Sequence, residues 1–276
     1  MKTAIIVSKK DLAGMNIKGS LINNFNFKKN NEKFDDNDIY ELNGNVRLYT
    51  VDKESIYNED IDKKINADLF IFATKHQSAK GIHSLSCHSP GNWSRAEAGG
   101  KDKKLCVAPA VLLKEAFIEL NNLGKDLHHE ITLEVTHHGP YLEKPCFFIE
   151  IGSDKDNWKN KKAGEVIARV IINLLKNIND IMENKNNYKV AFGIGGLHYA
   201  LSFNKRLVDT DIAIGHICPK YQLENLDKEM IIQAIDKTFE KVDFILLDWK
   251  GLGKEKQRIV ELLKGLKIEY RRTDKV

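Results

Sequence analysis

Short apolar runs of strand length alternate along this chain with longer segments of helical period. The strand-length runs are Thr3–Val7, Val46–Val51, Leu69–Ala73, Ile131–Val135, Cys146–Ile151, Val190–Ile194, Ile212–Ile217 and Phe244–Leu247. The clearest helical segment is Asn157–Ile181, in which apolar residues recur at a spacing that places them on one face. Alternation of this kind predicts an α/β fold, in which helices flank a largely parallel sheet.

Other helices and one exception complete the predicted fold. We expect helices from Pro109 to just before Gly124, over Asp227–Phe239 and over Lys254–Leu263. A short Gly-Pro loop with no helix joins Ile131–Val135 to Cys146–Ile151, so these two runs are expected to pair antiparallel. The prediction is therefore a mixed, largely parallel sheet flanked by helices.

The length of 276 residues is enough for a single domain covering residues 1–276. The region Asn23–Asn66 is rich in Asn, Asp and Lys and poor in apolar residues, so we interpret it as a polar surface excursion at about residues 23–66. No internal repeat is evident. No apolar stretch approaches the ~20 residues that a membrane span needs, and no signal peptide is recognised.

The composition favours a protein of the cytoplasm and leaves the partner open. Four scattered cysteines form no C-x-x-C pair, which argues against a zinc ribbon or a disulfide framework: Cys87, Cys106, Cys146 and Cys218. The net charge of +4 and the pI near 8.6 are compatible with a polyanionic partner, but most proteins with such a mild excess bind no nucleic acid.

The placement of the nine histidines is the most informative feature for function. Seven of them lie at or just past the end of a predicted strand: His76, His83, His88, His137, His138, His198 and His216. Ligands of open α/β sheets bind outside the carboxyl ends of the strands. We therefore expect several of these imidazoles to converge at one rim of the sheet, although any single one could be an unrelated loop or core histidine.

The segment Glu134–Pro140 places a carboxylate, a hydroxyl and two imidazoles around the end of a strand. Strand alternation puts Glu134 and Thr136 on one face and His137 on the other, and the Gly-Pro turn lets His138 point either way. These groups could supply metal ligands and a general base, or they could form a satisfied polar turn.

The segment His83–Trp93 offers two imidazoles, a thiol and several hydroxyls. On a strand, positions 83 and 88 point to opposite faces, so His83 and His88 can serve one metal site only if the chain bends.

Two glycine-containing segments expose backbone amides. Gly193–His198 follows a strand and lacks the third glycine of the dinucleotide-binding pattern, so its amides could face an anion or simply allow two backbones to cross. Lys250–Lys254 fails the P-loop pattern but could hold a phosphate at a helix start, unless it is only a solvated charged turn.

Taken together and in order, these segments resemble the archaeal and plant type of D-aminoacyl-tRNA deacylase. The resemblance rests on Ala4–Ser8, His83–Trp93, Glu134–Pro140, Phe148–Ser153 and Gly193–His198. It covers essentially the whole chain. One departure is Ser86, which stands where the family pattern has threonine and which keeps the hydroxyl.

The resemblance implies a hydrolase that cuts the ester between a D-amino acid, or mischarged glycine, and the 3′ end of tRNA. Such an enzyme recycles tRNA and protects translation from D-amino acids. The resemblance also implies zinc dependence, with one or two ions per chain, a monomer, and a core similar to peptidyl-tRNA hydrolases and nucleoside phosphorylases.

From the residues themselves we assign roles as hypotheses. The candidate zinc ligands are His83, His88, His137 and His138. The candidate catalytic groups are Glu134 as general base or as a partner of the metal ligands, Thr136 beside it, Gly195 and Gly196 as oxyanion donors, and His198 or His216 as the acid for the leaving ribose. The candidate contacts to the tRNA backbone are Lys250, Lys254, Arg271 and Arg272.

Two other classes of function stay open. A zinc-dependent amidase or peptidase would also need the metal, whereas only a deacylase needs tRNA. A non-catalytic RNA-binding module is disfavoured, because the chain lacks an aromatic RNP-like signature and a histidine cluster has no evident purpose there.

Overall fold

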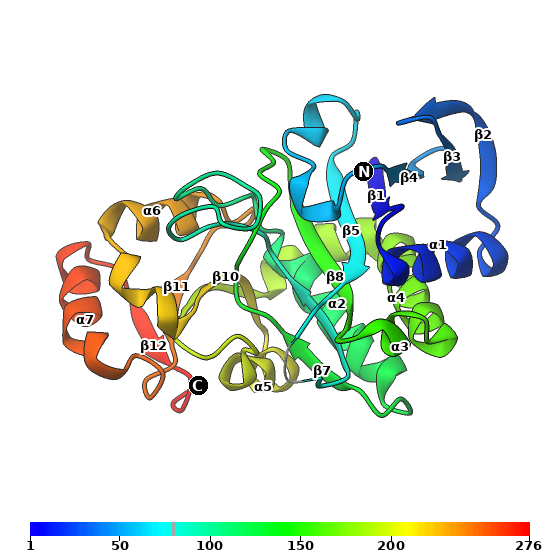
Figure 1. Cartoon of the computed structure of the whole chain (residues 1–276). Coiled ribbons are helices and arrows are strands. Elements are labelled where there is room, and N and C mark those ends of the chain that lie inside the picture. Colours follow the sequence, from blue (N-terminus) through cyan, green and yellow to red (C-terminus); the bar gives the residue numbers. More distant parts are fainter. Residues whose placement is uncertain (79–80) are drawn as a thin grey trace.

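The computed structural model describes residues 1–78 and 81–276, and its strands form two sheets (Figure 1). The eight-stranded sheet has the order β2-β3-β4-β1-β5-β8-β6-β7, and the four-stranded sheet has the order β10-β9-β11-β12. The strands of the larger sheet are β1 (Thr3–Ser8), β2 (Lys28–Phe34), β3 (Asn37–Leu42), β4 (Val46–Val51), β5 (Leu69–Lys75), β6 (Ser84–His88), β7 (Glu130–Leu133) and β8 (Cys146–Gly152). Those of the smaller sheet are β9 (Lys189–Ile194), β10 (Ile212–Cys218), β11 (Phe244–Leu247) and β12 (Tyr270–Arg272).

Helices connect the strands and cover the sheets. The α-helices are α1 (Leu12–Asn24), α2 (Ala110–Gly124), α3 (Lys155–Trp158), α4 (Lys161–Glu183), α5 (Leu201–Asp209), α6 (Lys228–Asp236) and α7 (Lys256–Gly265). Short 3-10 helices lie at Ser55–Tyr57, Ile61–Lys63, Lys185–Asn187, Lys220–Asn225 and Gly253–Glu255. None of the helices in the described ranges is long and apolar enough to cross a bilayer.

One continuous hydrophobic core joins the two sheets. Helices α1, α2 and α4 pack together over the larger sheet, and α2 also contacts β10 of the smaller one. Apolar side chains of both sheets belong to the same buried cluster, among them Ile71 of β5 and Ile214 of β10. The two sheets are therefore held as one body, which fixes the loops that meet between them.

The predicted helix Asn157–Ile181 is divided in two by its capping residues. Asp154 accepts hydrogen bonds from the first amides of α3, and Asn160 accepts them from the Lys162 and Ala163 amides at the start of α4. An Asn or Asp side chain at such a position satisfies amides that have no partner within the helix. A new helix therefore begins at Lys161, and its apolar stripe faces the core.

The expected mixed and largely parallel sheet is confirmed, but one predicted pairing is wrong. β7 and β8 are not neighbours, because β6 lies between them. β6 pairs parallel with β7 and antiparallel with β8, while β8 pairs parallel with β5. The short connection between β7 and β8 thus spans a strand that comes earlier in the chain. The division of the strands into two sheets was not predicted, although β9, β10 and β11 were, and β2, β3, β12, α1 and α5 were missed.

Candidate active site: a histidine–glutamate cluster in a cavity

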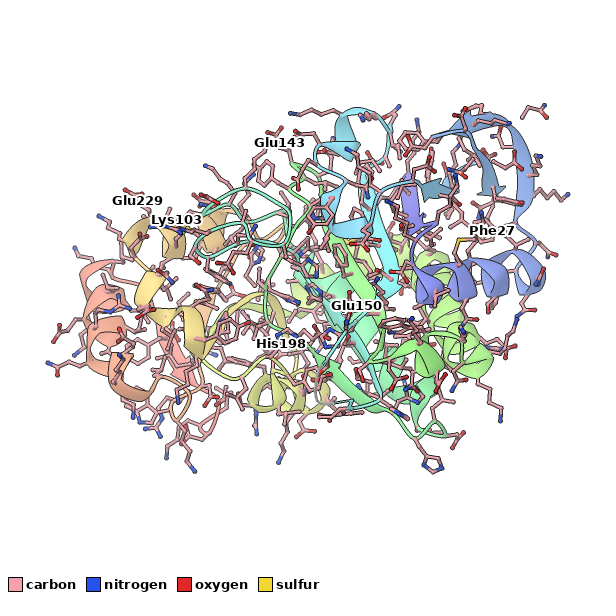
Figure 2. All side chains as sticks on the ribbon, in the orientation of Figure 1. Phe27, Lys103, Glu143, Glu150, His198 and Glu229 are labelled. Atoms are coloured by element: carbon pink, nitrogen blue, oxygen red, sulfur yellow. The ribbon has the colours of Figure 1, made fainter. Side chains whose placement is uncertain are left out.

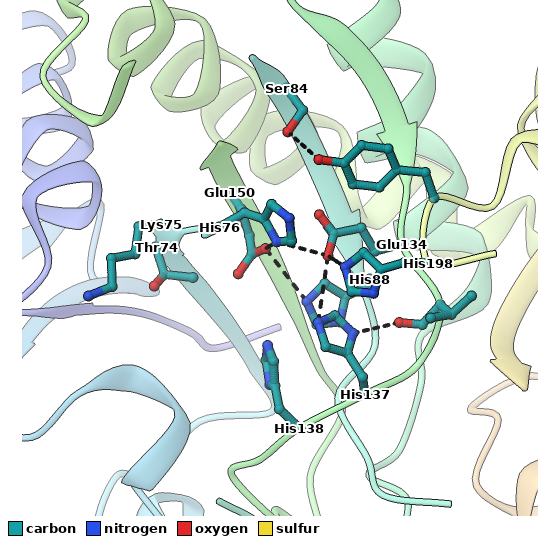
Figure 3. Close-up of polar contacts among 12 residues, drawn as sticks. Thr74, Lys75, His76, Ser84, His88, Glu134, His137, His138, Glu150 and His198 are labelled. Atoms are coloured by element: carbon teal, nitrogen blue, oxygen red, sulfur yellow. Dashed lines mark hydrogen bonds and ion pairs between the residues drawn. The ribbon is translucent and has the colours of Figure 1, made fainter. Parts of the chain in front are cut away.

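Two buried carboxylates and five imidazoles come together over the larger sheet. We call this group the histidine–glutamate cluster, and its members are His76, His88, Glu134, His137, His138, Glu150 and His198. Figure 3 shows these side chains directed toward one another, and Figure 2 places Glu150 and His198 in the middle of the molecule.

Glu134 is the most connected member of the cluster. Its Oε2 lies 3.0 Å from His198 Nε2, 3.2 Å from His76 Nδ1 and 3.6 Å from His137 Nε2. The second carboxylate, Glu150, has its Oε2 3.6 Å from His76 Nδ1 and 3.8 Å from His88 Nε2. The two acids therefore share His76 between them.

The cluster lies on a face of the sheet, and not at a common carboxyl edge as expected. His88 of β6 pairs with Phe148 of β8, and Ser86 pairs with Glu150. Because alternate residues share a face, His88 and Glu150 project to the same side. β6 runs antiparallel to β8, so the cluster collects side chains from strands of opposite direction.

The end of β7 explains why Glu134 and His137 reach the same site. Strand alternation would place them on opposite faces, but regular strand structure ends at Leu133. Beyond it, Glu134 forms only an isolated bridge with Tyr199, and His137 forms one with Pro90. The alternation predicted for Glu134–His137 is therefore wrong, and the irregular backbone lets both side chains turn inward.

Three imidazoles are oriented as metal ligands are. Nδ1 of His88, His137 and His138 lies 3.2, 2.7 and 2.6 Å from the backbone oxygens of Ser89, Val135 and Gly139. If each Nδ1–H donates to its carbonyl, each Nε2 keeps a free lone pair. Histidines that bind metals usually donate their other ring nitrogen to a carbonyl or carboxylate in this way.

Burial lowers the pKa of two imidazoles of the cluster, His137 and His138. Burial, with the nearby His138 and His88, lowers the pKa of His137 well below its usual range. Burial, with the neighbouring His88, lowers the pKa of His138 to about 4. Both rings are therefore neutral at neutral pH, which is the form that binds a metal.

The carboxylates act in the opposite direction on His76. Burial lowers its pKa, but attraction to the negative carboxylates of Glu134 and Glu150 outweighs burial and raises the pKa to about 10. The pKa of Glu134 is held well below its usual range, because hydrogen bonds from His198 and His76 outweigh its burial. In the absence of a cation, Glu134 is therefore ionised and His76 protonated at neutral pH.

The donor set fits a bound metal ion. Three sets each have ligand atoms within 4.8 Å of one another: His88, His137 and His138; His76, Glu134 and His198; and His88, Glu134 and Glu150. Several buried atoms of these side chains have no hydrogen-bond partner, namely His76 Nε2, His88 Nε2, Glu134 Oε1 and Glu150 Oε2. Buried polar atoms are rarely left unpaired, so an ion would satisfy groups that the protein leaves open.

A cavity of about 870 Å³ opens onto the cluster. His76, His137, His138, Glu150 and His198 line its polar part. Its apolar lining comes from Ile56, Ile82, Ala98, Leu197 and Leu201. This volume lies within the range of small-molecule sites, so the cavity can admit the end of a substrate but no folded domain.

The sequence matches the family model described as D-aminoacyl-tRNA deacylase over residues 63–271. A D-aminoacyl-tRNA deacylase of Thermococcus kodakarensis is 40% identical over 274 residues, covering 96% of this chain and 98% of the relative. The chain belongs to the D-aminoacyl-tRNA deacylase family. The Pyrococcus furiosus D-aminoacyl-tRNA deacylase is likewise 40% identical over 274 residues, with the same coverage. The crystal structure of a conserved protein of unknown function superposes with a TM-score of 0.87 at 29% identity, covering 99% of this chain and 95% of the other.

Only three of the four zinc ligands proposed from the sequence lie together in the cluster. His88, His137 and His138 lie together, whereas the His83 side chain is about half exposed (52%) and lies 3.9 Å from Asp154. His83 precedes β6, and its ring lies near His129 instead of the cluster. The expected opposite orientation of positions 83 and 88 accounts for this separation.

His216 and Thr136 are buried away from the cavity of this family member. His216 Nδ1 lies 3.1 Å from Thr136 Oγ1, and its Nε2 lies 3.0 Å from the Cys106 carbonyl oxygen. Thr136 Oγ1 also accepts a hydrogen bond from the Ile217 amide. Burial lowers the pKa of His216 to about 4, so it is a neutral core residue and does not reach a substrate.

We therefore expect His216→Ala to lower the free energy of unfolding and to leave the rate of catalysis nearly unchanged. Loss of the ring would unpair buried groups and open a space, which costs about 2–4 kcal/mol of unfolding free energy. Urea unfolding measures that loss, and turnover per folded molecule should stay within about threefold of the parent. A rate lower by a hundredfold in folded protein would return His216 to the catalytic machinery.

The glycine pair allows two loops to approach each other closely. Gly195 and Gly196 have φ values of +107° and +88°, which glycine adopts readily. The Gly195 amide donates to the Cys218 carbonyl, so it is already used. A Cβ on Gly251 would lie 2.5 Å from the Gly196 amide nitrogen. Neither glycine lines the cavity, and the crossing of two backbones accounts for both.

The four proposed tRNA contacts divide into two pairs. Arg271 and Arg272 lie on the edge strand β12 and are paired with Glu269 and Asp274. Lys250 and Lys254 are exposed in the loop after β11, at the same edge of the smaller sheet as the Leu197–His198 turn after β9. The lysine pair therefore lies at the sheet edge that carries this turn, and the arginine pair is engaged by carboxylates.

Two members of the cluster were not proposed as site residues. His76 follows β5, and Glu150 lies within the apolar strand β8. An acid between Ile149 and Ile151 in a strand buried along its whole length is itself a signal, because a buried carboxylate needs partners. Recognising that signal would have added Glu150 to the candidate site.

Proposed function

We propose that this chain hydrolyses the ester between a D-amino acid, or mischarged glycine, and the 3′ end of tRNA. Membership of the deacylase family over almost the whole chain carries this conclusion. The buried histidine–glutamate cluster supports it, because ester hydrolysis requires an activated water and a proton for the leaving alcohol.

We further propose zinc as the cofactor, held by Nε2 of His88, His137 and His138. These three rings are preferred because each has its other nitrogen next to a backbone carbonyl. Bound zinc supplies Lewis acidity, which lowers the pKa of water at the site toward ~7. The ligand atoms of His76, Glu134 and His198 also lie within 4.8 Å of one another, so a second ion fits there, in which case Glu134 and His198 would be its ligands instead of proton carriers.

Glu134 and His198 are proposed to move the protons. Glu134 is ionised and is positioned to accept a proton from the water that attacks the ester carbonyl. His198 lies 3.0 Å from the same carboxylate and its side chain is 38% exposed, so it can pass a proton to the departing ribose oxygen. The carbonyl carbon gains the water oxygen, the bond to the ribose breaks, and free tRNA and amino acid result.

Turnover of D-tyrosyl-tRNA, with L-tyrosyl-tRNA alongside, tests the proposed function. An apolar pocket distinguishes similar groups by only ~1–3 kcal/mol, so the choice between enantiomers must come from steric exclusion at the α-carbon. We expect release of D-tyrosine and little release of L-tyrosine. Equal turnover of both enantiomers would remove the chiral specificity, and turnover of neither would leave an amidase or an RNA-binding module.

Removal of the metal gives a separate prediction. Dialysis against a chelator should lower kcat by more than ~100-fold, because zinc ligation supplies the acidity of the water. Stoichiometric zinc should restore the rate, and elemental analysis of the same samples counts the ions. Full activity in a sample containing no metal would contradict the zinc proposal.

We also propose that the protein acts as a monomer in the cytoplasm. The cavity and the whole cluster are built from one chain, so the site needs no second copy. Light scattering of the purified protein should give a mass near 31.5 kDa.

A further inference from the structure

Two large apolar side chains are exposed on neighbouring loops, and one of them lines the cavity. Leu197 is 68% exposed and lines the cavity, and Tyr221 is 51% exposed. A hydrogen bond of 2.8 Å from the Lys220 amide to the Gly196 carbonyl joins the loops that carry them. Leu197 follows Gly196 in the chain and Tyr221 follows Lys220, so the two side chains belong to adjoining loops. We call Leu197, Lys220 and Tyr221 the cavity rim.

The rim is fixed to the cluster by backbone hydrogen bonds. The Val135 amide donates to the His198 carbonyl, and the Ala200 amide donates to the Leu133 carbonyl. These bonds hold the turn that bears Leu197 against the residues on either side of Glu134. Leu197 is exposed and lines the cavity, so its side chain is available to contact whatever enters the cavity.

Tyr221 is partly buried and partly in solvent, with an exposed fraction of 51%. Burial raises the pKa of Tyr221 to about 12, with Cys218 and the Glu134 carboxylate adding to the rise. The exposed part of the ring offers a flat surface of the kind on which nucleobases stack.

Positive charge continues from the rim across the smaller sheet. A methyl group built on Gly253 would lie 3.8 Å from Lys220 Nζ, so this ammonium sits against the loop that also carries Lys250 and Lys254. None of these three lysines forms an ion pair or a hydrogen bond through its side chain within the described ranges. Three cations without carboxylate partners along one loop are complementary to a phosphate backbone.

The proposed substrate can enter the cavity in only one direction. Its ester lies between an amino acid and the terminal ribose, and the rest of the tRNA extends from that ribose through its phosphate. Since the cavity cannot admit the folded tRNA, the amino acid must lie innermost and the terminal nucleotide at the mouth. The groups at the mouth therefore face the last nucleotide.

Building on the proposed function, we propose that the cavity rim is the binding site for the 3′-terminal nucleotide of tRNA. Its base contacts Leu197 and Tyr221, and its phosphate lies at Lys220, from which the backbone continues toward Lys250 and Lys254. Binding of the nucleotide at the rim thus positions the ester relative to Glu134 and His198. Single-stranded nucleic-acid sites combine stacking surfaces and basic grooves in this way.

Binding of uncharged tRNA tests this proposal without any hydrolysis. We would compare intact tRNA with the same tRNA lacking its terminal adenosine, using the parent and a Leu197→Ser, Tyr221→Ala double variant. Loss of one stacked base should weaken binding to the parent by ~10-fold, within the range for base stacking. In the double variant the two tRNAs should bind equally, because the surface that contacts the base is gone.

Matched controls distinguish the rim from a general surface effect. Val208 on α5 is 54% exposed and does not line the cavity, so Val208→Ala should keep the difference between the two tRNAs. Lys220→Ala should reduce the slope of log Kd against log salt by about 0.7–0.9, whereas Lys205→Ala on α5 should not.

Two results would overturn the rim assignment. One is equal binding of the two tRNAs by the parent, and the other is an unchanged difference in the double variant. Tyr221→Phe keeps the ring and should keep the difference, so it guards against misreading a folding defect. Since no ester is present, these results stand apart from the D-tyrosyl-tRNA assay that tests the proposed function.

Discussion

Glu134→Gln should lower kcat/KM for D-tyrosyl-tRNA by about 10²–10⁴-fold, the usual contribution of a positioned general base. Glutamine keeps the size of the side chain but cannot accept a proton at neutral pH. It also removes the negative charge that His76 and His198 contact at 3.2 and 3.0 Å. The effect should fall mainly on kcat, because Glu134 is buried behind the imidazoles and acts on the water more than on substrate binding.

A nearby acid provides the control for this prediction. Glu130 also lines the cavity but contacts none of the cluster in the described structure, so Glu130→Gln should keep kcat within about threefold. Stopped-assay kinetics, zinc content and thermal unfolding should be measured on both variants. Glu134 would lose the role of general base if Glu134→Gln bound zinc, folded normally and kept the parental kcat.

Much of the fold could be predicted from the sequence because its buried strands are continuous apolar runs. The bounds of β4 and β11 agree with the predicted strands. β2 was missed because six of its seven residues are polar and it lies at the exposed edge of the sheet, where no apolar signal is needed. α5 was missed because it buries only Phe203 and Leu207.

The order of strands could not be predicted from local pattern. Insertion of β6 between β7 and β8 depends on contacts between residues far apart in the chain. This insertion determines where the functional side chains meet, since it brings His88 beside Glu150. The expected convergence of imidazoles is therefore found, but on a face of the sheet instead of its carboxyl edge.

The distinction between working and structural histidines also depends on tertiary structure. His88 and His216 each belong to a buried strand, and both are fully buried. Both nitrogens of His216 have backbone or hydroxyl partners, whereas Nε2 of His88 has no hydrogen-bond partner. The two histidines differ in how many ring nitrogens have a hydrogen-bond partner, and this number cannot be predicted from the sequence.

The same distinction gives the second large prediction, which contrasts His137→Ala with His83→Ala. His137 Nε2 faces His88, His138 and Glu134, so its removal should reduce bound zinc to a small fraction and lower kcat/KM by more than ~100-fold. His83 was an equal candidate from sequence, but it is half exposed beside Asp154. His83→Ala should therefore keep the parental zinc content and rate.

Metal content decides between a ligand and a residue that merely supports the pocket. If His137 only packed against its neighbours, His137→Ala would lose stability and rate but would retain zinc after purification without chelator. If His83 were a ligand in solution, His83→Ala would lose zinc in step with activity, and the placement of this histidine outside the cluster would be wrong. Elemental analysis of the two proteins, prepared side by side, therefore tests the geometry of the site independently of the substrate.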